Sequence, residues 1–162
     1  MSLTLTVGAI LNEFRGIEHP AWQMAALLAL GPFWLAMVLY PHLREGTVAA
    51  YRVQRFDFWF RWFMIAAILA SAAVSLATQR LAGYPWITAK LLIFAFLILC
   101  GLMIRVRMPP FVEGLRDLAA DRATADGDTR MQASLARMRP WVLAIWAGVL
   151  ASAVLGVLGG RG

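Results

Sequence analysis

The sequence predicts an all-α polytopic membrane protein with four transmembrane helices in an up-and-down bundle. Of its 162 residues, 61% are hydrophobic and 15% are charged, whereas soluble domains are about 45–50% apolar and about 25% charged. A small soluble domain cannot bury so much apolar surface, because a large fraction of its surface stays exposed. Four apolar segments also reach the roughly 20 residues that a helix needs to cross a bilayer.

The four predicted spans cover residues 21–40, 58–78, 86–104 and 141–158. The first contains a Gly-Pro pair, the second follows an aromatic block, the third is bulky and the fourth is rich in small residues. Aromatic rings prefer the headgroup region, and those near the predicted boundaries are Trp22, Tyr40, Trp59, Trp62, Tyr84, Trp86 and Trp141. No internal repeat or low-complexity linker separates the spans, so residues 1–162 are expected to form a single transmembrane domain.

Positive charges predict the orientation of the spans. Loops 41–57 and 105–140, with their flanks, contain Arg44, Arg52, Arg55, Arg61, Arg105, Arg107, Arg116, Arg122, Arg130, Arg137 and Arg139. The opposite side has only Arg15, Arg80, Lys90 and Arg161. Because loops rich in arginine and lysine stay in the cytoplasm, both loops are predicted to be cytoplasmic. Both termini are then periplasmic, in a bacterial inner membrane.

The long third loop contains two segments with helical periodicity. Apolar residues recur at helical spacing in Phe111, Val112, Leu115, Leu118 and Ala119, and again in Met131, Leu135 and Met138. Residues 125–128 (Ala-Asp-Gly-Asp) are expected to break the pattern between them. These segments are predicted to lie at the membrane interface or to extend the neighbouring helices. Residues 2–15 predict a similar surface helix on the other side.

Small residues predict close contacts between helices inside the membrane. The fourth span has a small residue at every fourth position, namely Ala144, Gly148, Ser152 and Gly156, and the second span has Ala67, Ser71 and Ser75 in a similar register. Such spacing lets helix backbones approach each other closely, which is how helices associate in lipid. We interpret both stripes as helix-packing faces.

A few polar and aromatic residues are candidates for a cofactor or metal site. His19 precedes the first span and Lys90 lies near the start of the third, while Trp59 and Trp62 belong to an aromatic block that is able to stack on a quinone or porphyrin. An imidazole is a haem or metal ligand, so His19 is the candidate metal ligand. The catalytic motifs of common hydrolases, metalloproteases and P-loop enzymes are absent from the sequence.

Several local features resemble the small four-helix membrane proteins of the HemJ-type protoporphyrinogen oxidase and CopD group. They are a histidine before the first span, Gly31 followed by Leu39-Tyr40-Pro41, the segment from Trp86 to Leu91, an arginine-rich loop, and Arg137-Met138-Arg139-Pro140-Trp141. The resemblance implies haem b as a cofactor, with His19 and Lys90 at the corresponding positions. Residues 93–105, however, contain no histidine.

Three classes of function are left open by the sequence. The first is a non-enzymatic accessory or assembly subunit that packs against a membrane partner, as a homo-oligomer or in a larger complex. The second is a haem- or quinone-binding redox protein related to the HemJ type, and the third is a small transporter or copper-handling protein. The net charge of +6 does not indicate nucleic-acid binding, because the charges flank apolar segments instead of forming a basic patch.

Overall fold

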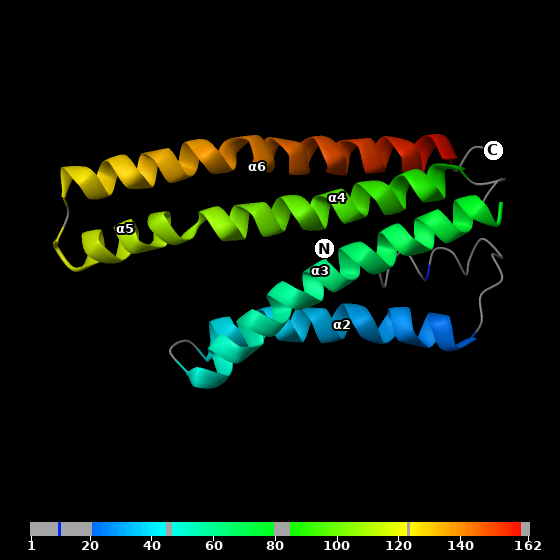
Figure 1. Cartoon of the computed structure of the whole chain (residues 1–162), viewed down its shortest axis with the longest axis horizontal. Coiled ribbons are helices and arrows are strands. Elements are labelled where there is room, and N and C mark those ends of the chain that lie inside the picture. Colours follow the sequence, from blue (N-terminus) through cyan, green and yellow to red (C-terminus); the bar gives the residue numbers. More distant parts are fainter. Residues whose placement is uncertain (1–9, 11–20, 45–46, 80–84, 123, 160–162) are drawn as a thin grey trace. The chain divides into compact units, whose positions relative to one another are not determined.

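A computed structural model describes Ile10 and residues 21–44, 47–79, 85–122 and 124–159. These residues form helices joined by short turns and contain no strand, which confirms the all-α class. The helices are α2 (Ala21–Leu43), α3 (Val48–Ala77), α4 (Pro85–Arg107), α5 (Pro109–Ala119) and α6 (Ala125–Gly159) (Figure 1). His19 and, apart from Ile10, the predicted surface helix at residues 2–15 lie outside the described residues.

Three of the helices are long and apolar enough to cross a membrane, namely α3, α4 and α6. They contain the second, third and fourth predicted spans, except for Thr78 at the end of the second. The first predicted span falls in α2, where a shorter apolar stretch runs from Ala25 to Pro41. At 1.5 Å per residue, the 30 residues of α3 measure about 45 Å, which exceeds the roughly 30 Å of a hydrocarbon core.

The chain divides into two compact units, Met1–Phe60 and Arg61–Gly162. In the first unit, α2 is followed by a short turn and by the start of α3. Thr47 precedes α3, and its hydroxyl oxygen accepts a hydrogen bond from the Ala50 amide at 3.2 Å while its O–H donates to the Arg44 carbonyl at 2.9 Å. This is the N-cap arrangement that satisfies one of the free amides of a first helical turn, so the sequence fixes where α3 begins.

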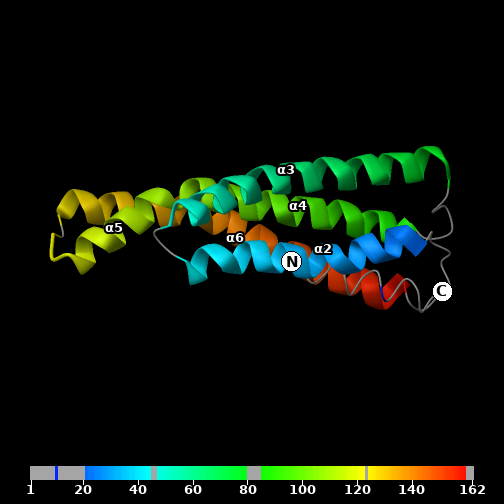
Figure 2. The same ribbon diagram turned by 90° about the horizontal axis from the view of Figure 1, so that it is seen from below.

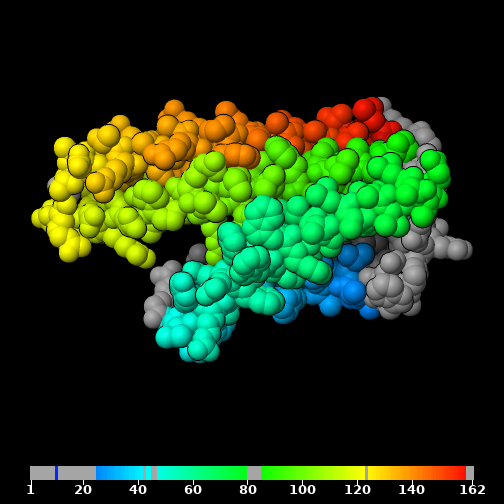
Figure 3. All heavy atoms as spheres, viewed as in Figure 1, coloured from blue at the N-terminus to red at the C-terminus, as the bar shows by residue number. Residues whose placement is uncertain are grey.

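In the second unit, α4 and α6 lie side by side along most of their length, as the ribbon and space-filling views show (Figures 1, 2 and 3). Their direction is antiparallel, because Gly148 lies against Leu97 whereas Gly159 lies against Trp86. A Cβ atom added to Gly148 would come within 2.8 Å of the Leu97 side chain. The absence of a side chain at Gly148 therefore sets how closely the two backbones approach.

A pair of prolines separates α4 from α5. Pro109 and Pro110 occupy the first positions of α5, where the missing amide hydrogens have no intrahelical partner in any case. The Met108 carbonyl accepts hydrogen bonds from the amides of Phe111 and Val112 at 3.0 and 3.2 Å. The chain thus starts a new helix at once, and α5 continues beyond α4 alongside α6 (Figure 1).

The turn between α5 and α6 lies at residues 120–124, before the predicted break. Asp121 has a positive φ of 54°, and the Arg122 amide donates to the Asp117 carbonyl at 2.9 Å, which is a Schellman-type helix end. Thr124 then caps α6, because its hydroxyl accepts a hydrogen bond from the Gly127 amide at 3.1 Å. The predicted break at 125–128 is wrong, since these residues form the first turn of α6 and place two aspartates at its positive end.

Residues 109–139 form a helical hairpin, called here the α5–α6 hairpin. Gly114 lies against Met131, and the Ser134 hydroxyl donates to the Arg107 carbonyl at 2.7 Å. Because α6 is one helix of 35 residues that includes Pro140, its first half extends the predicted span instead of folding onto a membrane surface. Of the two possibilities left open by the sequence, residues 125–139 adopt the helix-extending one.

Candidate functional site

The structure describes three of the four residues predicted to hold a cofactor, namely Trp59, Trp62 and Lys90. Trp62 lies three positions after Trp59 on α3, and the two residues are 41% and 64% exposed, respectively. Lys90 lies on α4, and its side chain is half-buried. Haem binding and a role for His19 stay predictions.

The small residues of the fourth span differ from those of the second in what surrounds them. On α6, Gly148 and Gly156 lie against Leu97 and Lys90 of α4. On α3, the side chains of Ala67 and Ser71 are exposed and Ser75 is half-buried. The buried residues of this part of α3 are instead Met64, Ile65, Ile68 and Ala72. Ala144 and Ser152 are half-buried.

A buried carboxylate lies in the first unit, at Asp57. Its side chain is 3% exposed, and its Oδ1 accepts a hydrogen bond of 3.2 Å from the indole N–H of Trp34, which is 1% exposed. Buried charged groups are costly and need polar partners. Because Trp34 is on α2 and Asp57 is on α3, this bond fixes the register between the two helices.

Aromatic rings surround the Trp34–Asp57 pair. The Phe60 ring packs edge-on against Trp34 and Phe33, with centroids at 5.5 and 6.2 Å, and it stacks with Phe56 at 6.2 Å. Such contacts add about 0.5–1.5 kcal/mol per pair beyond the burial of area. The sequence block at residues 55–62 predicted an aromatic surface, but periodicity does not show which indole meets the one carboxylate in that block.

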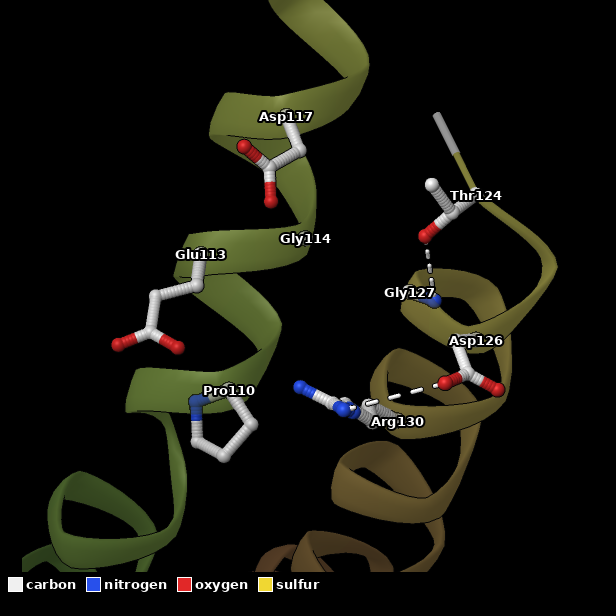
Figure 4. Close-up of a pocket in the computed structure, with 8 residues that line it drawn as sticks. All are labelled: Pro110, Glu113, Gly114, Asp117, Thr124, Asp126, Gly127 and Arg130. Atoms are coloured by element: carbon white, nitrogen blue, oxygen red, sulfur yellow. Dashed lines mark hydrogen bonds and ion pairs between the residues drawn. The ribbon is translucent and has the colours of Figure 1, made fainter. Parts of the chain in front are cut away.

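The far end of the α5–α6 hairpin contains a shallow cavity of about 370 Å³. It is lined by Pro110, Glu113, Gly114, Asp117, Thr124, Asp126, Gly127 and Arg130 (Figure 4). Two of its carboxylates already pair with arginines, Asp117 with Arg122 at 3.4 Å and Asp126 with Arg130 at 3.9 Å. In the described residues, no group of three or more His, Cys, Asp or Glu side chains is arranged to hold a metal ion.

Charge is distributed unevenly along the hairpin. Five carboxylates and three arginines lie between residues 113 and 130, which gives this tip a net charge of −2. Four arginines and no carboxylate lie at the base, namely Arg105, Arg107, Arg137 and Arg139. The Arg107 guanidinium packs over the Trp141 ring at 5.1 Å, so the base combines cationic and aromatic groups as membrane boundaries do.

Two leucines remain uncovered on α5, although they belong to its apolar face. Leu115 and Leu118 are 45% and 52% exposed. They are three positions apart and therefore point to the same side of the helix. Gly114, one residue away, already meets Met131 of α6, so α6 covers only part of the apolar face of α5. The uncovered part lies outside the predicted spans.

Comparisons of the chain with protein-family models, with curated proteins and with solved structures found no match.

Proposed function

We propose that the protein crosses a bacterial inner membrane four times, through α2, α3, α4 and α6. The α5–α6 hairpin then stands in the cytoplasm, and both termini are periplasmic. The arginines at the base of the hairpin support this orientation, because such charges favour the cytoplasmic side and anionic headgroups. The three long apolar helices support three of the crossings, and the shorter apolar stretch of α2 supports the fourth.

In this arrangement, we propose that the protein is a non-enzymatic accessory or assembly subunit whose hairpin binds a membrane partner. The observation that carries the proposal is the exposed pair Leu115 and Leu118 on a helix held outside the predicted spans. Residues 125–140 of α6 measure about 24 Å at 1.5 Å per residue. Leu115 and Leu118 therefore lie in water, beyond the end of the span, and exposed apolar groups in water mark contact surfaces.

A protein fits this surface better than the lipid bilayer does. The cytoplasmic leaflet is negatively charged, and the tip of the hairpin has a net charge of −2, so the tip is repelled from it. A partner with a shallow apolar groove and a basic rim matches both the leucines and the charge. Leucines spaced by three positions are the usual anchors when a helix binds in such a groove.

Photo-crosslinking in native membranes tests this proposal. A photoreactive residue at Leu118 is expected to give a discrete protein adduct, whereas the same residue at the exposed, lipid-facing Leu150 of α6 is expected to give none. The same photoreactive residue at Arg122, an exposed position of the turn, controls for random collisions in the cytoplasm. Equal adducts at Leu118 and Arg122, or none at Leu118, would show that the leucine pair is not the contact surface.

A further inference from the structure

Lys90 places a positive charge in the contact between α4 and α6. Its side chain is half-buried, and its ammonium nitrogen lies 5.2 Å from the centre of the Trp86 ring, one helical turn away. On α6, a Cβ atom added to Gly156 would lie 2.9 Å from the same nitrogen. The ammonium group therefore rests on the bare backbone of α6, beside the indole.

Two glycines make room for this arrangement. A Cβ atom on Gly159 would come within 2.5–2.8 Å of three atoms of the Trp86 ring, a distance that real side chains do not adopt. At Gly156 an added Cβ would displace the ammonium group. Trp86 and Lys90 thus pack against these two glycines at the Pro85 end of α4, and the four residues are called here the Lys90 site.

No carboxylate of the second unit reaches the Lys90 site in the described residues. The described carboxylates of this unit all lie between residues 113 and 128, in the α5–α6 hairpin. Asp128 precedes Gly156 by 28 residues of one continuous helix, which is about 42 Å. Within the described part of this unit, the cation–π contact with Trp86 is what stabilises the Lys90 charge.

The position of Lys90 directs its charge to the end of the span. Helical side chains lean towards the N-terminus of their helix, so the ammonium group points back to the level of Trp86, an aromatic of the type that marks the membrane boundary. The first turn of α4 adds the partial positive charge of a helix N-terminus. An anionic group at headgroup level would neutralise both charges.

We propose that the Lys90 site binds the phosphate of an anionic phospholipid in the leaflet that faces the Pro85 end of α4. Lys90 supplies the charge, Trp86 lies against the headgroup region, and Gly156 and Gly159 leave the space that the Lys90 and Trp86 side chains occupy. The inference requires that α4 span the membrane, but it does not depend on the partner-binding function of the hairpin.

Native mass spectrometry of the full-length protein from mixed micelles tests the inference. With equal amounts of phosphatidylglycerol and phosphatidylcholine, the wild type is expected to retain phosphatidylglycerol at least about fivefold more, as one lysine near a headgroup implies. Lys90→Met keeps the length of the side chain and should abolish the preference. Lys90→Arg should keep it. Gly156→Ala, which displaces the ammonium group, should reduce it.

Two controls distinguish loss of the lipid site from a general loss of positive charge or of folding. Arg122→Met removes an exposed cation from the hairpin and should leave the preference unchanged. Thermal unfolding in phosphatidylcholine micelles shows which variants are folded, and Lys90→Arg gives a folded comparison if Lys90→Met is unstable. An unchanged preference in Lys90→Met, or displacement of the lipid by millimolar inorganic phosphate, would overturn the proposal of a phospholipid site.

Discussion

Replacing Leu115 and Leu118 together by glutamine is expected to release the protein from its partner complex. Burying a leucine at an interface contributes about 1.5–3 kcal/mol, so losing two should weaken binding at least about 100-fold. Glutamine is a good helix former, and both leucines are exposed, so the hairpin itself should stay folded. Native gel electrophoresis of solubilised membranes should show the protein shift from a large complex to its free size.

The matched control for this double variant is Arg116→Gln, on the same helix between the two leucines. It changes a charge but leaves the apolar pair intact, and the complex should stay assembled. If the leucine variant migrates like the wild type, or if Arg116→Gln releases the protein equally, apolar docking through α5 is contradicted. The double variant and the crosslinking experiment are independent tests. The double variant measures the affinity for the partner, whereas crosslinking measures contact with it.

Removing the buried carboxylate is expected to destabilise the first unit. Asp57→Ala removes the hydrogen bond from the Trp34 N–H, and a hydrogen bond to a charged group contributes about 1.5–3 kcal/mol. For a protein of this size, each kcal/mol lowers the midpoint of thermal unfolding by about 2–4 °C. Asp57→Asn keeps an acceptor oxygen for the Trp34 N–H and should lose less stability than Asp57→Ala.

Asp117→Ala is the matched control, because the Asp117 side chain is more than half exposed and its ion pair with Arg122 is a surface pair. Such pairs contribute about 0–1 kcal/mol. Thermal unfolding in one detergent, followed by circular dichroism, should rank Asp57→Ala below Asp57→Asn and both below Asp117→Ala. Equal midpoints for Asp57→Ala and Asp117→Ala would show that the bond to Trp34 does not hold α2 and α3 in register.

The helical class and the long apolar helices are predictable from the sequence, because hydropathy alone identifies a stretch that needs lipid. The course of the third predicted loop, residues 105–140, is not predictable from the sequence. Pro140 and the Asp-Gly pair near 127 suggest interruptions, yet α6 continues through both. The causes differ: Thr124 caps the helix locally, three residues before the glycine, whereas α6 packs against α4 and α5 and stays helical through the proline.

The sites depend on pairings that hydropathy does not encode. The sequence shows one carboxylate in the aromatic block of α3, but only the structure assigns it to Trp34. Likewise, the small residues of α6 predict close packing, whereas the two α4 side chains that use the space, Lys90 and Trp86, emerge from the register of the helices. Periodicity locates faces of helices, and register decides which residues of two faces meet.

Labelling of single cysteines tests most directly whether the α5–α6 hairpin stands in the cytoplasm. Ala120→Cys places a thiol in the exposed turn, and Leu150→Cys places one in the span of α6. The native Cys100 is buried and serves as the unlabelled baseline. With a membrane-impermeant maleimide, Ala120→Cys should react in inverted inner-membrane vesicles but not in spheroplasts, and Leu150→Cys should react in neither. Reaction of Ala120→Cys in spheroplasts, or in neither preparation, would contradict a cytoplasmic hairpin.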